Sequence, residues 1–237
     1  MGQNAALKDV NIWYPDQNPN SITPYPYTIA LSGNNCVVQN VALVNSYLGI
    51  QADGGTEWIL STVTGTPLAL GLWADGLYDI CQTEDIRFSP AAWANSGLTN
   101  APAAGGGYAA WMMANGTGMQ IFRADGVINV NTTISGYHLG LDFEQSANGN
   151  SGCAFYNGYV TNCNIAVQAT TEQNAGGLEF SACTLIGGTA INANVNTNNS
   201  TIHCSHCTII GINGTAVYAA GAAISRTTAW YWTEILE

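Results

Sequence analysis

The chain has 237 residues, of which 47% are hydrophobic and only 8% are charged, and its formal net charge is −11. This length suits one domain or one elongated solenoid, and the apolar share is sufficient for a continuous core. No stretch approaches 18 uninterrupted apolar residues, which argues against a membrane protein. With four Lys and Arg in total, the chain is poorly suited to nucleic acid, whereas a neutral polysaccharide meets no electrostatic barrier.

Met1-Gly2 leads directly to Val10–Trp13, which has the pattern of a strand, so we expect no signal peptide within this chain and interpret its start as that of a mature or truncated protein. We nevertheless expect an extracellular or cell-surface protein. The chain (1–237) is interpreted as a single domain, either whole or a fragment of a longer protein.

A repeat begins near Ile29 and runs to Ala220. The tripeptide Ala-Asp-Gly occurs at 52–54, 74–76 and 124–126, each time two residues after Ile50, Leu72 or Phe122. The same frame extends with looser chemistry to segments 29–33, 141–144, 167–170, 191–194 and 217–220. All but one of the steps between units fit a period of about 19 to 26 residues. The exception contains an insertion at 90–118, rich in Ala, Gly and Asn.

Two further sets of short apolar segments keep step with the first. One set opens at Val41, Val63, Ile86, Thr132, Cys153, Cys183 and Cys207, and the other includes segments 36–38, 58–60, 127–128 and 178–180. Three strands of three to five residues per repeat, separated by Gly and Asn, are too short for βαβ units. The pattern predicts an all-β protein, a single-stranded right-handed parallel β-helix of about eight coils with one long loop insertion.

Three runs resemble the pectin lyase-like superfamily: NCVVQNVALVNSYLGIQ, TGTPLALGLWADGLYDICQTEDIRFSP and ISGYHLGLDFEQ. They look closest to the pectate lyase-like domains near putative glycoside hydrolases, and the likeness spans about residues 30 to 220. It implies the β-helix fold. It is much less specific for a reaction, since the superfamily includes lyases, hydrolases, epimerases and phage tail proteins.

The cysteine count of seven argues against a complete disulfide framework. Cys153, Cys183 and Cys207 fall at one expected inward position, so we interpret them as buried thiols. The segment His203–Cys207 is unsuited to a zinc site, because Cys204 and His206 point to one side of a strand and Cys207 to the other.

One outer face is predicted to carry an acidic strip. Alternation along the strands directs the residues between the inward apolar positions outward, pairing Gln51 with Asp53, Trp73 with Asp75, Arg123 with Asp125, and Asp142 with Glu144. Carboxylates that lie close together perturb each other's pKa and can supply one acid and one base, as a glycosidase requires.

We therefore expect Asp125 and Glu144 to be the catalytic pair, with Asp75 as a third carboxylate. The residues expected to bind substrate are Arg123, Trp73, Asp142, Asp53 and, from an insertion that walls the strip, Trp93, Tyr108 and Trp111. The competing interpretation is ordinary turn chemistry, in which an Asp bonds its own backbone before a Gly. No cofactor is required, although Asp75, Asp125 and Glu144 could hold Ca²⁺.

Three functions remain open at this stage. The first is a polysaccharide-active enzyme, a glycoside hydrolase. The second is a non-catalytic structural or adhesive β-helix, such as a tail-fibre or surface-filament module, which would self-associate through the helix ends. There Trp230-Tyr231-Trp232 is expected to cover the open end. The third is a Ca²⁺-dependent polysaccharide lyase, with Arg123 as base or stabiliser.

Overall fold

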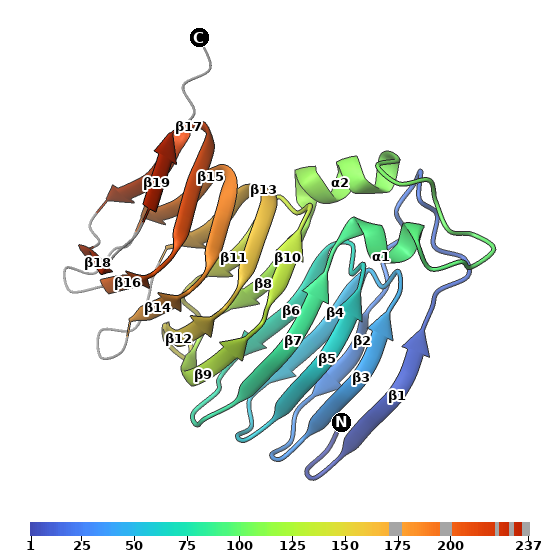
Figure 1. Cartoon of the computed structure of the whole chain (residues 1–237). Helices are drawn as coiled ribbons and strands as arrows, with labels where there is room; N and C mark the ends of the chain where they lie inside the picture. Colours follow the sequence, from blue (N-terminus) through green and yellow to red (C-terminus); the bar gives the residue numbers. More distant parts are fainter. Residues whose placement is uncertain (171–176, 195–200, 221–222, 228–229, 234–237) are drawn as a thin grey trace.

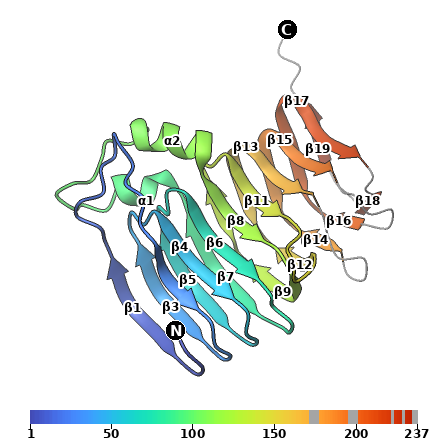
Figure 2. The same ribbon diagram turned by 180° about the vertical axis from the view of Figure 1, so that it is seen from behind.

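The computed structural model describes residues 1–170, 177–194, 201–220, 223–227 and 230–233. It is an all-parallel β-solenoid of about seven turns (Figure 1), which confirms the predicted β-helix class. Within the described residues, hydrogen bonds link nineteen strands into one continuous sheet that winds around a buried core. The first coils and the last coils lie at opposite ends of the stack, as both views show (Figures 1 and 2).

The N-terminal coils have two strands each. The first column of strands contains β1 (Ala6–Ile12), β3 (Val37–Leu43), β5 (Ile59–Gly65) and β7 (Gln82–Phe88). The second contains β2 (Tyr27–Leu31), β4 (Leu48–Asp53), β6 (Leu70–Asp75), β8 (Thr117–Ile121) and β11 (Leu139–Phe143).

From β9 onward the first column divides into two. The lower part continues through β9 (Ala124–Val130), β12 (Ser151–Tyr156), β14 (Leu178–Ser181), β16 (Thr201–Ser205) and β18 (Ala223–Thr227). The upper part continues through β10 (Thr133–Ser135), β13 (Tyr159–Ala169), β15 (Thr184–Asn194), β17 (Thr208–Ala220) and β19 (Trp230–Thr233). β13, β15 and β17 also continue the second column through their C-terminal halves.

A column of residues in the left-handed conformation marks the bend between these two parts. Its members have φ between 53 and 59° and are Asp9, Asn40, Thr62, Asp85, Asn131, Asn157, Ala182 and His206. Asn and Asp tolerate this conformation better than other non-glycine residues. Their side chains also bond from coil to coil: Asn40 Nδ2 donates to Asp9 Oδ1 at 2.7 Å, and Asn157 Nδ2 to Asn131 Oδ1 at 2.7 Å.

The register corrects one unit of the predicted repeat. β6 and β11 both pair with β8 so that Leu72 and Leu141 lie beside Met119, not beside Phe122. The third Ala-Asp-Gly opens β9 instead of closing a strand. Its glycine, Gly126, has φ of +76°, like the glycines of the two earlier motifs. The tripeptide therefore encodes a turn conformation, which recurs three residues away from the position that the repeat predicts.

The cysteine ladder needs a similar correction. All seven cysteines are free and buried, as expected. However, Cys153 lies within β12, whereas Cys183 and Cys207 each follow the left-handed corner residue. In the coil of Cys153 the corner residue is Asn157, and Gly158 takes the position after it that Cys183 and Cys207 hold in their coils. The neighbouring core is aromatic, with the rings of Phe155 and Phe180 stacked at 5.4 Å.

The insertion forms two helices, α1 (Pro90–Ala94) and α2 (Gly107–Asn115), along the upper edge of the solenoid (Figure 1). Trp93 and Tyr108 are fully buried, with ring centroids 5.3 Å apart in an edge-to-face contact. Thr66 Oγ1 accepts a hydrogen bond from the backbone N of Trp93 and donates to Ser89 O. Across the described residues, no helix has the length and apolar character to span a membrane.

At the C-terminal end, β19 pairs with β17. The predicted end-covering side chains of Trp230, Tyr231 and Trp232 lie outside the described residues, because only their backbone is described.

Candidate functional site

The predicted outward column exists on the second column of strands. Pairings between successive coils align Gln51, Trp73, Gln120, Asp142, Gln168, Asn192 and Tyr218. Gln120 stands where the repeat predicted Arg123, because of the register of β8. One column further along, Asp53 pairs with Asp75, and extension of the same register aligns Phe122, Glu144 and Thr170 after them. We call these two columns the acidic strip.

Asp142 and Glu144 form a carboxyl pair on one coil of the strip. Asp142 is only 2% exposed, and its Oδ2 accepts a hydrogen bond from Gln120 Nε2 at 3.1 Å. Its Oδ1 is buried and receives no donor. Glu144, just past the end of β11, is more exposed.

Burial, followed by the charge of Glu144, raises the pKa of Asp142 to about 7, and the hydrogen bond from Gln120 opposes this rise only in part. Burial and the nearby Glu144 carboxylate both favour the protonated form of Asp142. The pair can therefore hold one proton near neutral pH.

An aromatic pair adjoins these carboxyls. The rings of Trp73 and Phe122 lie 5.7 Å apart and are inclined by 52°, and both side chains are partly exposed. The expectation that Phe122 points inward is wrong; Met119 and Ile121 are the buried residues of that coil. Phe122 is one coil from Glu144, a backbone separation of about 4.8 Å. The strip thus places flat apolar faces beside an ionisable pair.

The side chain of Asp75 links three coils by hydrogen bonds. Its Oδ1 accepts hydrogen bonds from Gly76 N at 2.7 Å, Arg123 N at 3.1 Å and Ser146 Oγ at 2.8 Å. Its Oδ2 accepts another from Asn148 Nδ2 at 3.1 Å. The side chain is 6% exposed. These four hydrogen bonds hold the loop after β11 against the turns of the earlier coils.

Arg123 lies in the turn between β8 and β9, and Asp125 is the second residue of β9; both lie outside the two columns. Arg123 Nη2 is 2.7 Å from Asp125 Oδ2, and its Nη1 donates to Asn148 O at 3.0 Å. The guanidinium also covers the ring of Tyr78, 4.7 Å from its centroid. The hydrogen bond to Asp125 raises the pKa of Arg123. Asp125 itself aligns with Gly152 of β12, so it is not stacked with Glu144 as the repeat predicted.

The three carboxylates considered for Ca²⁺ do not share one position. Extended register puts Asp75 and Glu144 on either side of Phe122, about two coil spacings or roughly 10 Å apart along the backbone. Asp125, the second residue of β9, lies outside both columns. Among the residues that the structure describes, no group of three or more His, Cys, Asp or Glu side chains is arranged to hold a metal ion.

The insertion does not wall the acidic strip. Trp111, which is partly buried, lies against Tyr47 with centroids 6.1 Å apart, and Tyr47 precedes β4. The strip begins at the other end of that strand, where Asp53 is exposed. Trp93 and Tyr108, expected to bind substrate, are core residues without an exposed face.

Sequence reasoning missed Gln120, Ser146 and Asn148. The alternation of Met119, Gln120 and Ile121 carried a signal for an outward Gln120, but the third Ala-Asp-Gly obscured it. The contacts of Ser146 and Asn148 with Asp75 span more than 70 residues of chain, and no local pattern encodes them.

The fold defines this chain as a parallel β-solenoid. No protein-family model matches it, and neither a curated protein nor a solved structure matches it.

Proposed function

We propose that this β-solenoid is a polysaccharide-active enzyme, a glycoside hydrolase that uses Glu144 and Asp142. The observation that carries the proposal is the carboxyl pair, in which Asp142 has its pKa raised to about 7 by burial and by Glu144. Glycoside hydrolysis needs a carboxylic acid that remains protonated near neutral pH. Trp73 and Phe122 add faces on which a sugar ring can pack.

In this proposal Glu144 contacts the substrate, because it is the more exposed member of the pair. The proton held by Asp142 passes to Glu144 and from there to the glycosidic oxygen as the bond to the anomeric carbon breaks. A water molecule then adds to that carbon, and its proton returns to the Glu144 carboxylate. Asp142 is a positioning residue that stores the proton. It replaces Asp125 in the pair expected from the sequence, because Asp125 is ion-paired with Arg123.

The likeness of the three quoted sequence runs to the pectin lyase-like superfamily supports this proposal, and the parallel solenoid is consistent with it. We extend the proposal to membership of that superfamily and to an extracellular or cell-surface location, where polysaccharides are found. A Ca²⁺-dependent lyase is less well supported. The ion pair with Asp125 favours the charged form of the Arg123 guanidinium, which counts against Arg123 as the base of a lyase and leaves it the role of a stabiliser.

A non-catalytic structural or adhesive module is the second candidate. The observation that favours it is Asp75, which bonds the backbone N of its own turn residue Gly76 and three further donors. Such bonding is what turn chemistry predicts. In addition, within the described residues β1 pairs only with β3. A strand with one unpaired edge can template self-association at that end of the solenoid.

The test is a screen of neutral and uronic-acid polysaccharides, with and without Ca²⁺, using the wild type and the variants Glu144→Gln, Asp142→Asn and Asp125→Asn. We expect soluble fragments from the wild type, none from Glu144→Gln, and a shifted pH profile for Asp142→Asn. Asp125→Asn serves as the matched control and should retain activity. Unsaturated products that require Ca²⁺ would establish a lyase. No release from any substrate would favour the structural module.

A further inference from the structure

A groove of about 400 Å³ lies between the insertion and the outer face of the first coils. Asn11, Ala42 and Thr64 align in one column across β1, β3 and β5, and line it together with Gly65. The facing wall comes from the insertion and from the segment after β1; the further lining residues are Trp13, Val44, Ala92, Ser96 and Leu98. Its size falls in the range of small-ligand sites.

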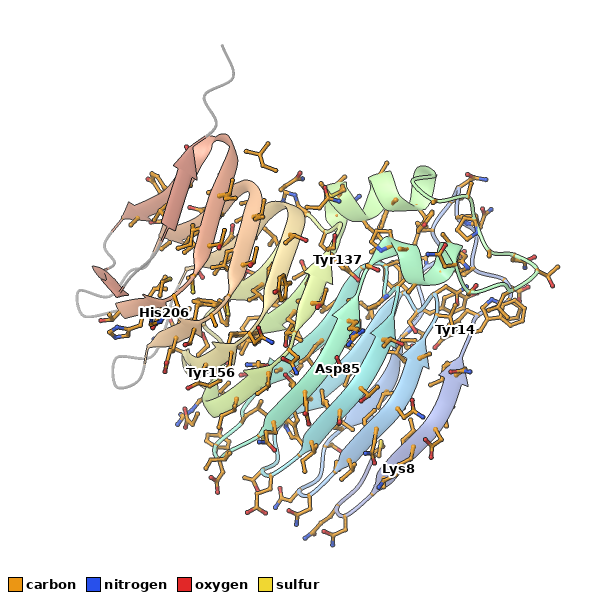
Figure 3. The ribbon with its side chains drawn as sticks, viewed as in Figure 1. Lys8, Tyr14, Asp85, Tyr137, Tyr156 and His206 are labelled. Atoms are coloured by element: carbon orange, nitrogen blue, oxygen red, sulfur yellow. The ribbon has the colours of Figure 1, made fainter. Side chains whose placement is uncertain are left out.

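Hydrogen bonds hold both walls of this groove in place. Asn45 is fully buried; its Oδ1 accepts from Tyr14 N at 2.8 Å and its Nδ2 donates to Tyr14 O at 2.9 Å, which fixes the backbone next to Trp13. Figure 3 places Tyr14 at the upper end of the first coils. Asn100 Nδ2 donates to Pro15 O at 2.8 Å, which ties the insertion to the same segment. The groove is therefore preorganised, which reduces the entropy cost of binding.

The lining has the composition of a site for an uncharged ligand. None of its residues is ionisable, although the chain carries 15 acidic residues. The next member of the column, Arg87, is ion-paired with Asp85 at 2.7 Å. Ala42, Val44 and Leu98 are apolar, whereas Asn11, Thr64 and Ser96 offer donors and acceptors. Trp13 contributes an indole whose Nε1 has no partner in the protein.

We infer that this groove binds a neutral saccharide, with one sugar ring packed on Trp13 and its hydroxyls bonded to Asn11, Thr64 and Ser96. Sugar rings have apolar C–H faces that suit an indole and hydroxyls that suit amide and hydroxyl groups. A charged ligand would find no counter-charge in the lining. The site lies on a different column of strands from Asp142 and Glu144 and does not depend on their proposed activity. It also gives the insertion a role away from the acidic strip.

The test is calorimetric titration of the whole chain with neutral hexasaccharides of β-1,4-linked glucose, mannose or xylose, and with oligogalacturonate as the charged probe. We expect saturable binding of at least one neutral probe, weakened tenfold or more in Trp13→Ala. Ala42→Leu, which fills the groove from its floor, should weaken binding similarly and replaces Trp13→Ala if that variant fails to fold. Gln39→Ala, exposed on the same strand, should bind like the wild type.

Three results would overturn the inference. They are no binding of any neutral probe, tighter binding of oligogalacturonate, and full binding by Ala42→Leu. Loss of binding in Glu144→Gln alone would move the ligand to the acidic strip and refute the groove. Conversely, binding that persists while no polysaccharide is cleaved would support the groove and count against the proposed hydrolase.

Discussion

Replacing Asp142 by asparagine tests whether the Asp142–Glu144 pair holds a proton near neutral pH, because asparagine cannot ionise. Asp142 has its pKa raised from 3.8 to about 7. Between these values the folded state binds more protons than the unfolded state, so the stability of the wild type falls as the pH rises. Linkage with these two values gives a loss of about 2 kcal/mol between pH 5.5 and pH 8.5. This loss of stability is the free-energy cost of ionising the buried Asp142 carboxyl beside Glu144.

Asparagine at position 142 cannot ionise, and its amide can donate where the protonated acid donates. We therefore expect Asp142→Asn to lack this loss and to be the more stable protein at pH 8.5. Urea denaturation followed by tryptophan fluorescence across this pH range measures the effect. Asp53→Asn, an exposed carboxylate at the end of β4, is the matched control and should keep the wild-type slope. Equal slopes for the wild type and Asp142→Asn would refute the assignment of a proton to this pair.

Three further predictions concern the scaffold, each measured as a change in the free energy of unfolding in urea. Asp75→Ala should lower the free energy of unfolding by about 2–4 kcal/mol, because the donors of Arg123, Ser146 and Asn148 lose a largely buried acceptor. A decrease below about 1 kcal/mol would refute the idea that these bonds hold the three coils together. Trp93→Ala should cost about 3–5 kcal/mol through the cavity left under the insertion, whereas a neutral result would mean that the helices are not anchored there. Gly65→Ala should destabilise by more than about 1 kcal/mol, since an added Cβ would lie 2.0 Å from Leu43 O and φ is +149°; a stable variant would contradict this close approach.

Much of the acidic strip followed from the sequence. The period and the alternation of apolar residues placed Gln51, Trp73 and Asp142 in one outward column, and the strand pairings confirm it. This prediction succeeds because each coil of a solenoid contacts only its neighbours, so a repeated inward pattern fixes both the register and the outward residues.

Two parts of the site depended on tertiary structure. The insertion reset the register at β8, where Met119 and Ile121 fill the core. A sequence motif for a turn carries no information about which core residues precede it. Aligning the third Ala-Asp-Gly with the first two therefore gave the wrong register for this coil and placed Arg123 and Asp125 in the acidic strip. The burial of Asp142 depends on the residues that surround it in the folded coils. Its raised pKa could therefore not be read from the chain.

The sequence by itself thus determined the solenoid and the column in which Asp142 lies, because local alternation and a fixed period are enough to stack coils. The tertiary structure alone decided that Asp142 is buried beside Glu144, that Asp75 links three coils by hydrogen bonds, and that the insertion covers the opposite end of the strands. Those outcomes depend on contacts between segments far apart in the chain, such as Asp75 with Asn148 and Asn100 with Pro15.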